Sequence, residues 1–116
     1  MLPITGPPKG VALTHYNLVA NMMQILHPEV KMVHKTTKEK QETTVAVLPF
    51  FHIYAMNTIM SLGLHLGTKT VTVPKFEPEM YLRACTTYKP TYLALVPPLV
   101  RYVMYSCTHN LVAPRF

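Results

Sequence analysis

Three short apolar runs, each followed by a segment with helical periodicity, constrain the fold of this chain most strongly. The first run is nearly continuous and the second is rich in β-branched residues, patterns that are typical of strands in a sheet. The runs cover Thr44–Pro49, Thr68–Pro74 and Thr91–Val96. Strands that alternate with helices form a parallel sheet through right-handed crossovers. We therefore expect an α/β fold, as a partial parallel sheet with covering helices.

Start and stop signals bound the helices around these runs. Thr14 is a suitable N-cap, and apolar residues recur after it at spacings of three and four, which predicts a helix over residues 14–26. The other expected helices cover Ile53–Leu66 with Gly67 at the end, a segment from Glu77-Pro78-Glu79 to Lys89-Pro90, and Leu99–Tyr105.

Composition excludes several classes of protein. The chain has 116 residues, 49% of them hydrophobic and 14% charged, which indicates one folded domain and not a disordered chain. Its net charge of +6 comes partly from a lysine-rich loop that also holds Glu39 and Glu42 and lacks interleaved aromatic residues, so we expect a solvated loop and no nucleic-acid partner.

The cysteines, histidines and apolar stretches indicate no metal site, disulfide framework or membrane span. Cys85 and Cys107 have neither metal-ligand spacing nor a disulfide pattern, which favours an intracellular location, and the histidines show no metal-ligand spacing. The longest apolar stretch, Phe50–Leu66, is interrupted by polar residues, so no membrane span is expected. We expect no metal site formed by these residues.

The segment before the first helix has the residues that a phosphate-binding loop needs. Small residues let backbone N–H groups turn toward an anion, and a lysine adds a full charge. Gly6, Lys9 and Gly10 meet this need. A solvated loop lysine is the alternative interpretation of Lys9.

Chemically useful side chains follow the predicted strands. His52 and Tyr54 follow the first strand, Lys75 and Phe76 follow the second, and Pro97-Pro98 follows the third. Because the carboxyl ends of parallel strands meet at one edge, we expect these turns to surround a cleft that suits an apolar carboxylic acid beside an anionic nucleotide. For His52, a core histidine bonded to the backbone is the alternative.

Several motifs together resemble the adenylate-forming superfamily, which includes acyl-CoA synthetases, 4-coumarate–CoA ligases and beetle luciferases. The loop and helix start match at Thr5, Gly6, Pro8, Lys9, Gly10, Val11, Leu13, Thr14, His15 and Asn17. Leu48–Tyr54 is similar to the family's acyl-pocket motif, and Pro74-Lys75-Phe76 and Tyr88–Val100 are similar to later turns and strands. The resemblance covers about residues 5–105 of a single partial domain, 1–116, and leaves 106–116 as a divergent tail.

The resemblance implies a two-step ligase that activates a carboxylic acid, fatty or aromatic, as an acyl-adenylate and transfers it to coenzyme A, with ATP and Mg²⁺. It implies that Thr5, Gly6, Lys9 and Gly10 contact the triphosphate and that His52 lies beside the reacting carboxylate. It further implies that Tyr54, Lys75 and Phe76 serve the acyl or pantetheine pocket, and that the protein is cytoplasmic or peroxisomal.

Departures from the family pattern limit what the chain is expected to do alone. Met1, Leu2, Pro3 and Ile4 stand where the family has small hydroxylated residues, and the sequence contains no aspartate, although the family holds the ribose through an acidic residue. We expect a fragment of the parent enzyme that is inactive alone. The alternatives are a non-catalytic module that pairs with another polypeptide, such as the rest of the parent enzyme, and a truncated luciferase-like isoform.

Overall fold

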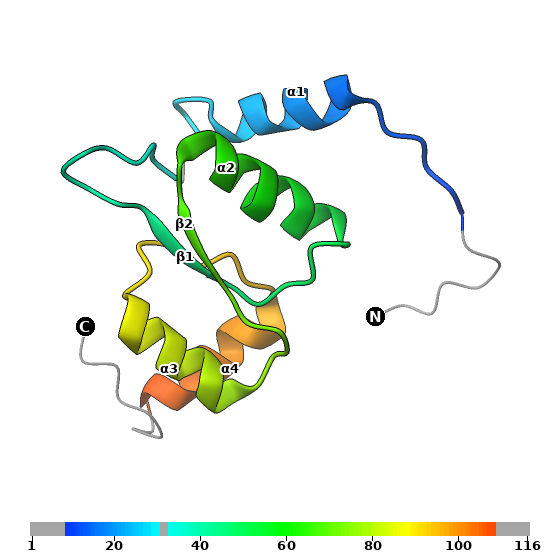
Figure 1. Cartoon of the computed structure of the whole chain (residues 1–116). Coiled ribbons are helices and arrows are strands. Elements are labelled where there is room, and N and C mark those ends of the chain that lie inside the picture. The colour runs from blue at the N-terminus through cyan, green and yellow to red at the C-terminus, as the bar shows by residue number, and fades with distance from the viewer. Residues whose placement is uncertain (1–8, 31–32, 109–116) are drawn as a thin grey trace.

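The computed structural model describes residues 9–30 and 33–108 and places a parallel strand pair between two helical layers. Helices α1 and α2 lie on one side of the strands, and α3 and α4 lie on the other (Figure 1). This arrangement confirms the predicted α/β class. The elements are α1 (His15–Ile25), β1 (Thr43–Ala46), η1 (Ala55–Ser61), α2 (Leu62–Leu66), β2 (Lys69–Thr72), α3 (Pro78–Tyr88) and α4 (Pro97–Thr108).

Strand β1 is the centre of the fold because all four of its residues are buried. Side chains alternate between the faces of a strand, so neighbouring residues enter different clusters. Val45 packs with Tyr81 and Cys85 of α3, whereas Ala46 packs with Ala55 and Ile59 of η1. Burial on both faces is what the continuous apolar run predicted.

The prediction of a third strand is wrong, because the sheet that the described residues form has two strands, β1 and β2. Thr91–Val96 lies without regular secondary structure. Thr91 reaches β1 through its backbone N–H, which donates to the carbonyl of Thr43 at 2.9 Å. The N–H of Thr43, however, donates to the Thr91 hydroxyl at 3.1 Å. A side chain thus takes the place of a backbone acceptor, and the ladder does not continue.

Most helix ends follow the predicted signals. Thr14 and Asn17 form a capping box at the start of α1. Gly67 ends α2 in the left-handed conformation at φ 71°, which glycine adopts without a Cβ penalty. Lys89, at φ 45°, ends α3 before Pro90. Helix α4 begins at Pro97, two residues earlier than predicted, because prolines are tolerated in a first turn that has no intrahelical acceptor for their nitrogen.

The predicted helix over 53–66 divides into a π-helix, η1, and a short α-helix, α2. The backbone N–H of Leu62 donates to the carbonyl of Asn57, five residues earlier, as the π pattern requires. The Ser61 hydroxyl also bonds five residues back, to the carbonyl of Met56 at 2.9 Å. The wider turns change which side chains share a face, so this segment matters for the site described below.

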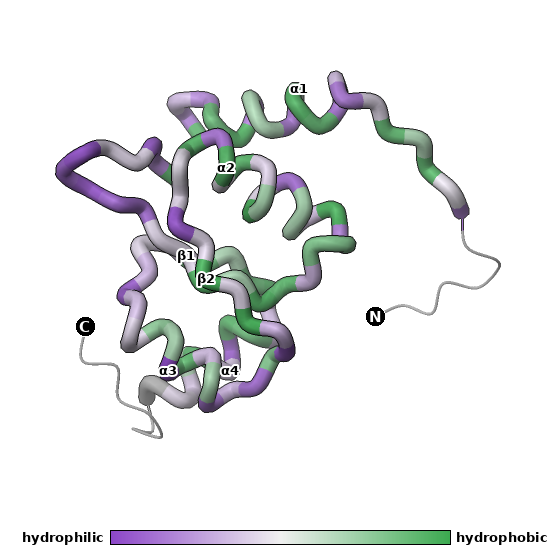
Figure 2. The backbone as a smooth tube through the Cα atoms, in the orientation of Figure 1, coloured by the Kyte–Doolittle hydropathy of each residue, from purple (hydrophilic) through white to green (hydrophobic). Residues whose placement is uncertain are grey.

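The polar loop that precedes β1 is anchored to the fold by Glu42. Figure 2 shows hydrophilic residues gathered in this loop, between α1 and β1. Glu42 is 3% exposed and its Oε1 lies 2.8 Å from Nζ of Lys40, while its other carboxylate oxygen accepts a hydrogen bond from the Thr91 hydroxyl. Its carbonyl accepts from the N–H of Lys69, at the start of β2, at 2.8 Å. The hydrogen bonds from Lys40 and Thr91 lower the pKa of Glu42, although burial opposes this.

Replacing this carboxylate is expected to make the stability of the chain less dependent on pH. The folded-state pKa of Glu42 lies below its ordinary value of 4.5, so its contribution is complete above that value and is lost as the pH falls through the folded-state pKa. We expect Glu42→Gln to lower the unfolding free energy by about 1–3 kcal/mol at neutral pH and by less in acid.

Urea unfolding of both forms at about pH 7 and about pH 3.5 measures this difference. Glu29→Gln is the control, because the Glu29 side chain is exposed. Its ion pair with His27, at 4.0 Å, is a weak surface contact. A loss for Glu42→Gln that is the same at both pH values contradicts the role given to its charge.

Candidate functional site

The chain leaves β1 and β2 at the same edge of the sheet because the strands are parallel (Figure 1). The parallel pairing continues past the strands, since the N–H of Val73 donates to the carbonyl of Ala46 at 3.2 Å. The turn after β1 carries His52 and Tyr54, and the turn after β2 carries Lys75 and Phe76. The edge where ligands of open α/β sheets bind therefore leads into the predicted site residues.

His52 is an exposed residue in a tightly bonded turn. Its backbone N–H donates to the carbonyl of Pro49 at 3.0 Å, and its carbonyl accepts from the N–H of Met56 at 2.9 Å. Its Nδ1 accepts a hydrogen bond from the backbone N–H of Tyr54 at 3.2 Å. An accepting Nδ1 places the proton of a neutral ring on Nε2, so the turn selects one tautomer. Exposure argues against the alternative of a core histidine.

Tyr54 lines an apolar pocket of about 290 Å³ that lies between α1, η1 and the segment before α4. Its side chain is 38% exposed, at the boundary between the pocket and solvent. Thr58, one helical turn further on, lines the same pocket. The remaining lining residues are Ile25, Val30, Val33, Leu62, Tyr92, Leu93 and Ala94. Burial raises the pKa of Tyr92 above its ordinary value, so this wall residue is even harder to ionise than an exposed tyrosine.

The other predicted site residues are not among those that line this pocket. Phe76 packs against Tyr81 and Tyr102, with ring centroids 5.9 and 6.1 Å away, on the side of the sheet that α3 and α4 cover. Lys75, beside it, is exposed. Phe76 thus serves as a packing residue in this arrangement, and the structure does not bring the Lys75–Phe76 turn to the apolar pocket.

The predicted phosphate loop lies only partly within the described residues. Thr5 and Gly6 are outside them, whereas Lys9 and Gly10 are described and exposed. Among the residues that the structure describes, none has an atom within 4 Å of where a Cβ at Gly10 would lie, so these residues leave the backbone there open to a ligand. The segment that contains both residues runs outward from the start of α1 (Figure 1).

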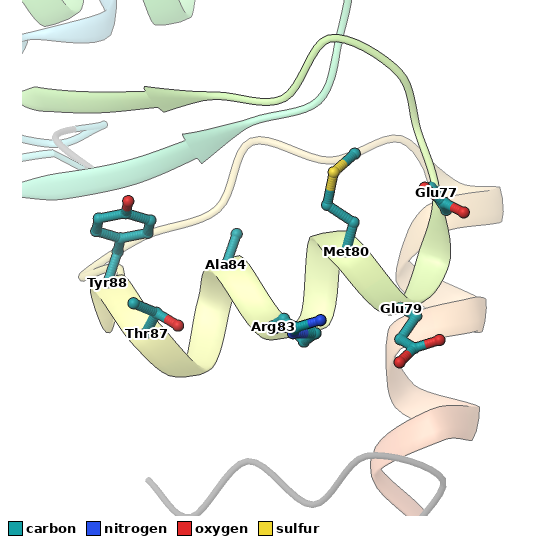
Figure 3. A pocket seen from close by; sticks show the side chains of 7 residues that line it. All are labelled: Glu77, Glu79, Met80, Arg83, Ala84, Thr87 and Tyr88. Carbon is teal, nitrogen blue, oxygen red and sulfur yellow. The ribbon is translucent and has the colours of Figure 1, made fainter.

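A second, larger hollow of about 500 Å³ lies along α3 (Figure 3). Two carboxylates, Glu77 and Glu79, and the guanidinium of Arg83 line it together with Met80, Ala84, Thr87 and Tyr88, all from α3 and its N-cap. In Figure 3, Met80, Ala84 and Tyr88 point toward the strands, while Arg83 and Thr87 lie on the side of α3 that faces the viewer. No residue that the sequence predicts for the site lies here, so the apolar pocket is the better candidate.

Comparison with known protein families matches residues 4–114 to the family described as AMP-binding enzyme. The chain belongs to this family of AMP-binding enzymes. A relative from Dictyostelium discoideum, "Probable 4-coumarate--CoA ligase 1", is 37% identical over 95 residues, which are 82% of this chain and 16% of the relative. The predicted membership of the adenylate-forming superfamily is confirmed.

Two further relatives are ligases of different acids. "4-coumarate--CoA ligase 1" from Arabidopsis thaliana is 40% identical over 96 residues, 83% of this chain and 17% of its own length. "Long-chain-fatty-acid--CoA ligase" from Bacillus subtilis (strain 168) is 35% identical over 97 residues, 82% of this chain and 16% of its own length. The chain thus spans about one sixth of the length of the relatives it matches.

Sequence reasoning missed part of the pocket wall in this member of the family. Thr58 and Leu62 follow Tyr54 at spacings of four, a signal that could have placed them on one helical face. The contribution of Tyr92–Ala94 carries no such local signal, because it depends on a contact between segments far apart in the sequence.

Two observations bear on other kinds of site. Among residues 9–30 and 33–108, no group of three or more histidine, cysteine, aspartate or glutamate side chains is placed to hold a metal ion. In the same part of the chain, no helix has the length and apolar character needed to cross a membrane.

Filling the apolar pocket is expected to weaken the binding of an apolar probe. Ala94→Leu adds three carbons inside the pocket and should weaken binding of the fluorescent fatty acid cis-parinaric acid by about tenfold or more. Ala84→Leu is the matched control, because Ala84 is also half-buried but lines the hollow along α3. A fluorescence titration of both variants measures the effect, and equal weakening in the two would contradict the assignment of this pocket.

Proposed function

We propose that this chain forms part of an ATP-dependent ligase that activates a carboxylic acid as an acyl-adenylate and transfers it to the thiol of coenzyme A. The observation that supports this most directly is the apolar pocket whose wall residue, Tyr54, donates its backbone N–H to Nδ1 of His52. An apolar tail in the pocket would place its carboxylate end toward the exposed turn that holds the imidazole. Relatives named as ligases of coumarate and of long-chain fatty acids fit this class of substrate.

In this proposal each predicted residue has a limited role. The pocket wall at Tyr54 and Thr58 holds the apolar part of the acid, and His52 orients the reacting carboxylate and gates the access of the thiol. Lys9, beside the open backbone at Gly10, supplies a cation for the phosphates of ATP, and Thr5 and Gly6 belong to the same loop. Lys75 lies in the neighbouring turn, outside the apolar pocket, and in this proposal it serves the pantetheine group.

In this proposal Mg²⁺ has no direct ligand among the described residues of this chain. When bound, Mg²⁺ neutralises charge on the phosphates of the nucleotide. The described residues have no cluster of carboxylates suited to it, so in this proposal the ion is held through the nucleotide and by residues elsewhere in the enzyme.

The chain of 116 residues alone is expected to be inactive. Phosphoryl and adenylyl transfer need several cationic groups positioned around the phosphates, whereas Lys9 lies in an exposed segment that runs outward from α1. Calorimetric titration with ATP and Mg²⁺, and a pyrophosphate-release assay with 4-coumarate and with dodecanoate, should both give no signal. Micromolar binding of ATP or any release of pyrophosphate would contradict inactivity.

The role of His52 is tested in the full-length enzyme that contains these residues. His52→Ala is expected to lower kcat/KM for the acid by about 100-fold, because the reacting carboxylate loses its orientation. His65→Ala is the control, since His65 is also an exposed histidine but lies in α2, outside the turn that carries His52 and Tyr54. Equal effects of the two substitutions would refute the role given to His52.

Exposed apolar side chains favour one alternative, a non-catalytic module that binds another polypeptide. Tyr16, Val19 and Met23 of α1 are 79%, 53% and 47% exposed. Burial of such a surface against a partner would be favourable. Light scattering that shows a folded, monodisperse monomer over a wide concentration range would argue against self-association through this surface.

A further inference from the structure

A hydrogen-bonded pair of asparagines joins the two helices that wall the apolar pocket. Asn57 of η1 is 4% exposed, and its Nδ2 donates to Oδ1 of Asn21 in α1 at 2.6 Å. The same Nδ2 lies 3.4 Å from the carbonyl oxygen of Leu18, also in α1. The side chain of one buried residue is thus bound to two successive turns of the opposite helix.

This pair lies immediately beside residues of the pocket on both helices. Asn21 precedes Ile25, which lines the pocket, by one helical turn of α1. Asn57 directly precedes Thr58, which lines the pocket from η1. The hydroxyl of Thr58 donates to the carbonyl of Tyr54, which ties these two wall residues together. The distance between the helices at the pocket is therefore fixed close to the asparagine contact.

Packing alone does not explain an asparagine at this position. Oδ1 of Asn57 is buried and has no hydrogen-bond partner among the described residues, which is unfavourable for a polar atom. A leucine of similar size would fill the space without this cost. What asparagine adds is a pair of directional hydrogen bonds. Its bonds to Asn21 and Leu18 define one placement of the π-helix against α1.

We propose that Asn21 and Asn57 are positioning residues that set the width of the apolar pocket and thereby the size of the acyl group it accepts. The proposal rests on the proposed function in one respect, namely that this pocket takes the apolar part of an acid. Neither side chain lines the pocket, so both act through their neighbours Ile25 and Thr58.

The test uses the full chain and two substitutions at Asn21, whose side chain is exposed and tolerant of change. Asn21→Ala removes the acceptor, whereas Asn21→Asp keeps an oxygen where Nδ2 of Asn57 donates. Octanoate, dodecanoate and hexadecanoate are competed against cis-parinaric acid, and the ratio of their affinities is recorded. Nuclear magnetic resonance follows the side-chain NH₂ group of Asn57 and the methyl groups of Ile25 and Leu62.

We expect Asn21→Ala to change the ratio of affinities by about threefold to tenfold, the range that loss of one hydrogen bond gives. In this variant the side-chain NH₂ protons of Asn57 should exchange faster with solvent, and the methyl resonances of Ile25 and Leu62 should shift. Asn21→Asp should restore the affinity ratio and the resonances. A merely structural role would weaken all three acids equally without changing their ratio, and that result overturns the proposal.

Failure of the proposed function gives a different result. If the unaltered chain binds none of the three acids, the pocket is not an acyl site, and the size-selecting role falls with it. If the unaltered chain binds them and Asn21→Ala leaves both the ratio and the methyl resonances unchanged, the positioning role alone is overturned. Asn57→Leu provides the second variant, for which the same change in ratio is expected as for Asn21→Ala.

Discussion

Burial of β1 on both faces is the constraint on which the rest of this structure depends. A strand of four residues cannot be covered on two sides by its own neighbours in sequence, so helices must pack on each face. Val45 requires α3 on one side, and Ala46 requires η1 on the other. Glu42 extends this constraint to the polar groups, since its carboxylate and backbone hold the preceding loop, β2 and Thr91 to the start of the strand.

Signals that depend on neighbouring residues were sufficient to predict most of the fold. Thr14 with Asn17, Gly67, and Lys89 with Pro90 mark helix ends through local geometry, and the structure confirms each. The third strand failed for the opposite reason. Whether Thr91–Val96 becomes a strand depends on β1, and there the Thr91 hydroxyl takes a position that a backbone carbonyl would need.

The candidate site shows the same division between local and distant information. His52 and Tyr54 were predicted from a motif, and the structure joins them through one hydrogen bond. Thr58 was missed, and the contribution of Tyr92–Ala94 could not be predicted, because a pocket wall made by separate segments depends on packing. Phe76 was predicted for a substrate pocket, whereas its contacts with Tyr81 and Tyr102 place it in an aromatic cluster.

The π-helix has a consequence for how this region of the protein can vary in length. A π-turn holds about one residue more than an α-turn, so η1 can be regarded as an α-helix with an inserted residue. Deleting one residue within Ala55–Ser61 would return the segment to α-helical geometry, and the helix on either side would nearly keep its orientation, because the wide turn absorbs the extra residue. Side chains inside the segment, such as Asn57 and Thr58, would then face different neighbours, although the composition of the helix would hardly change. Single-residue insertions and deletions at this place could therefore remodel the pocket while the sheet and its other helices stay intact.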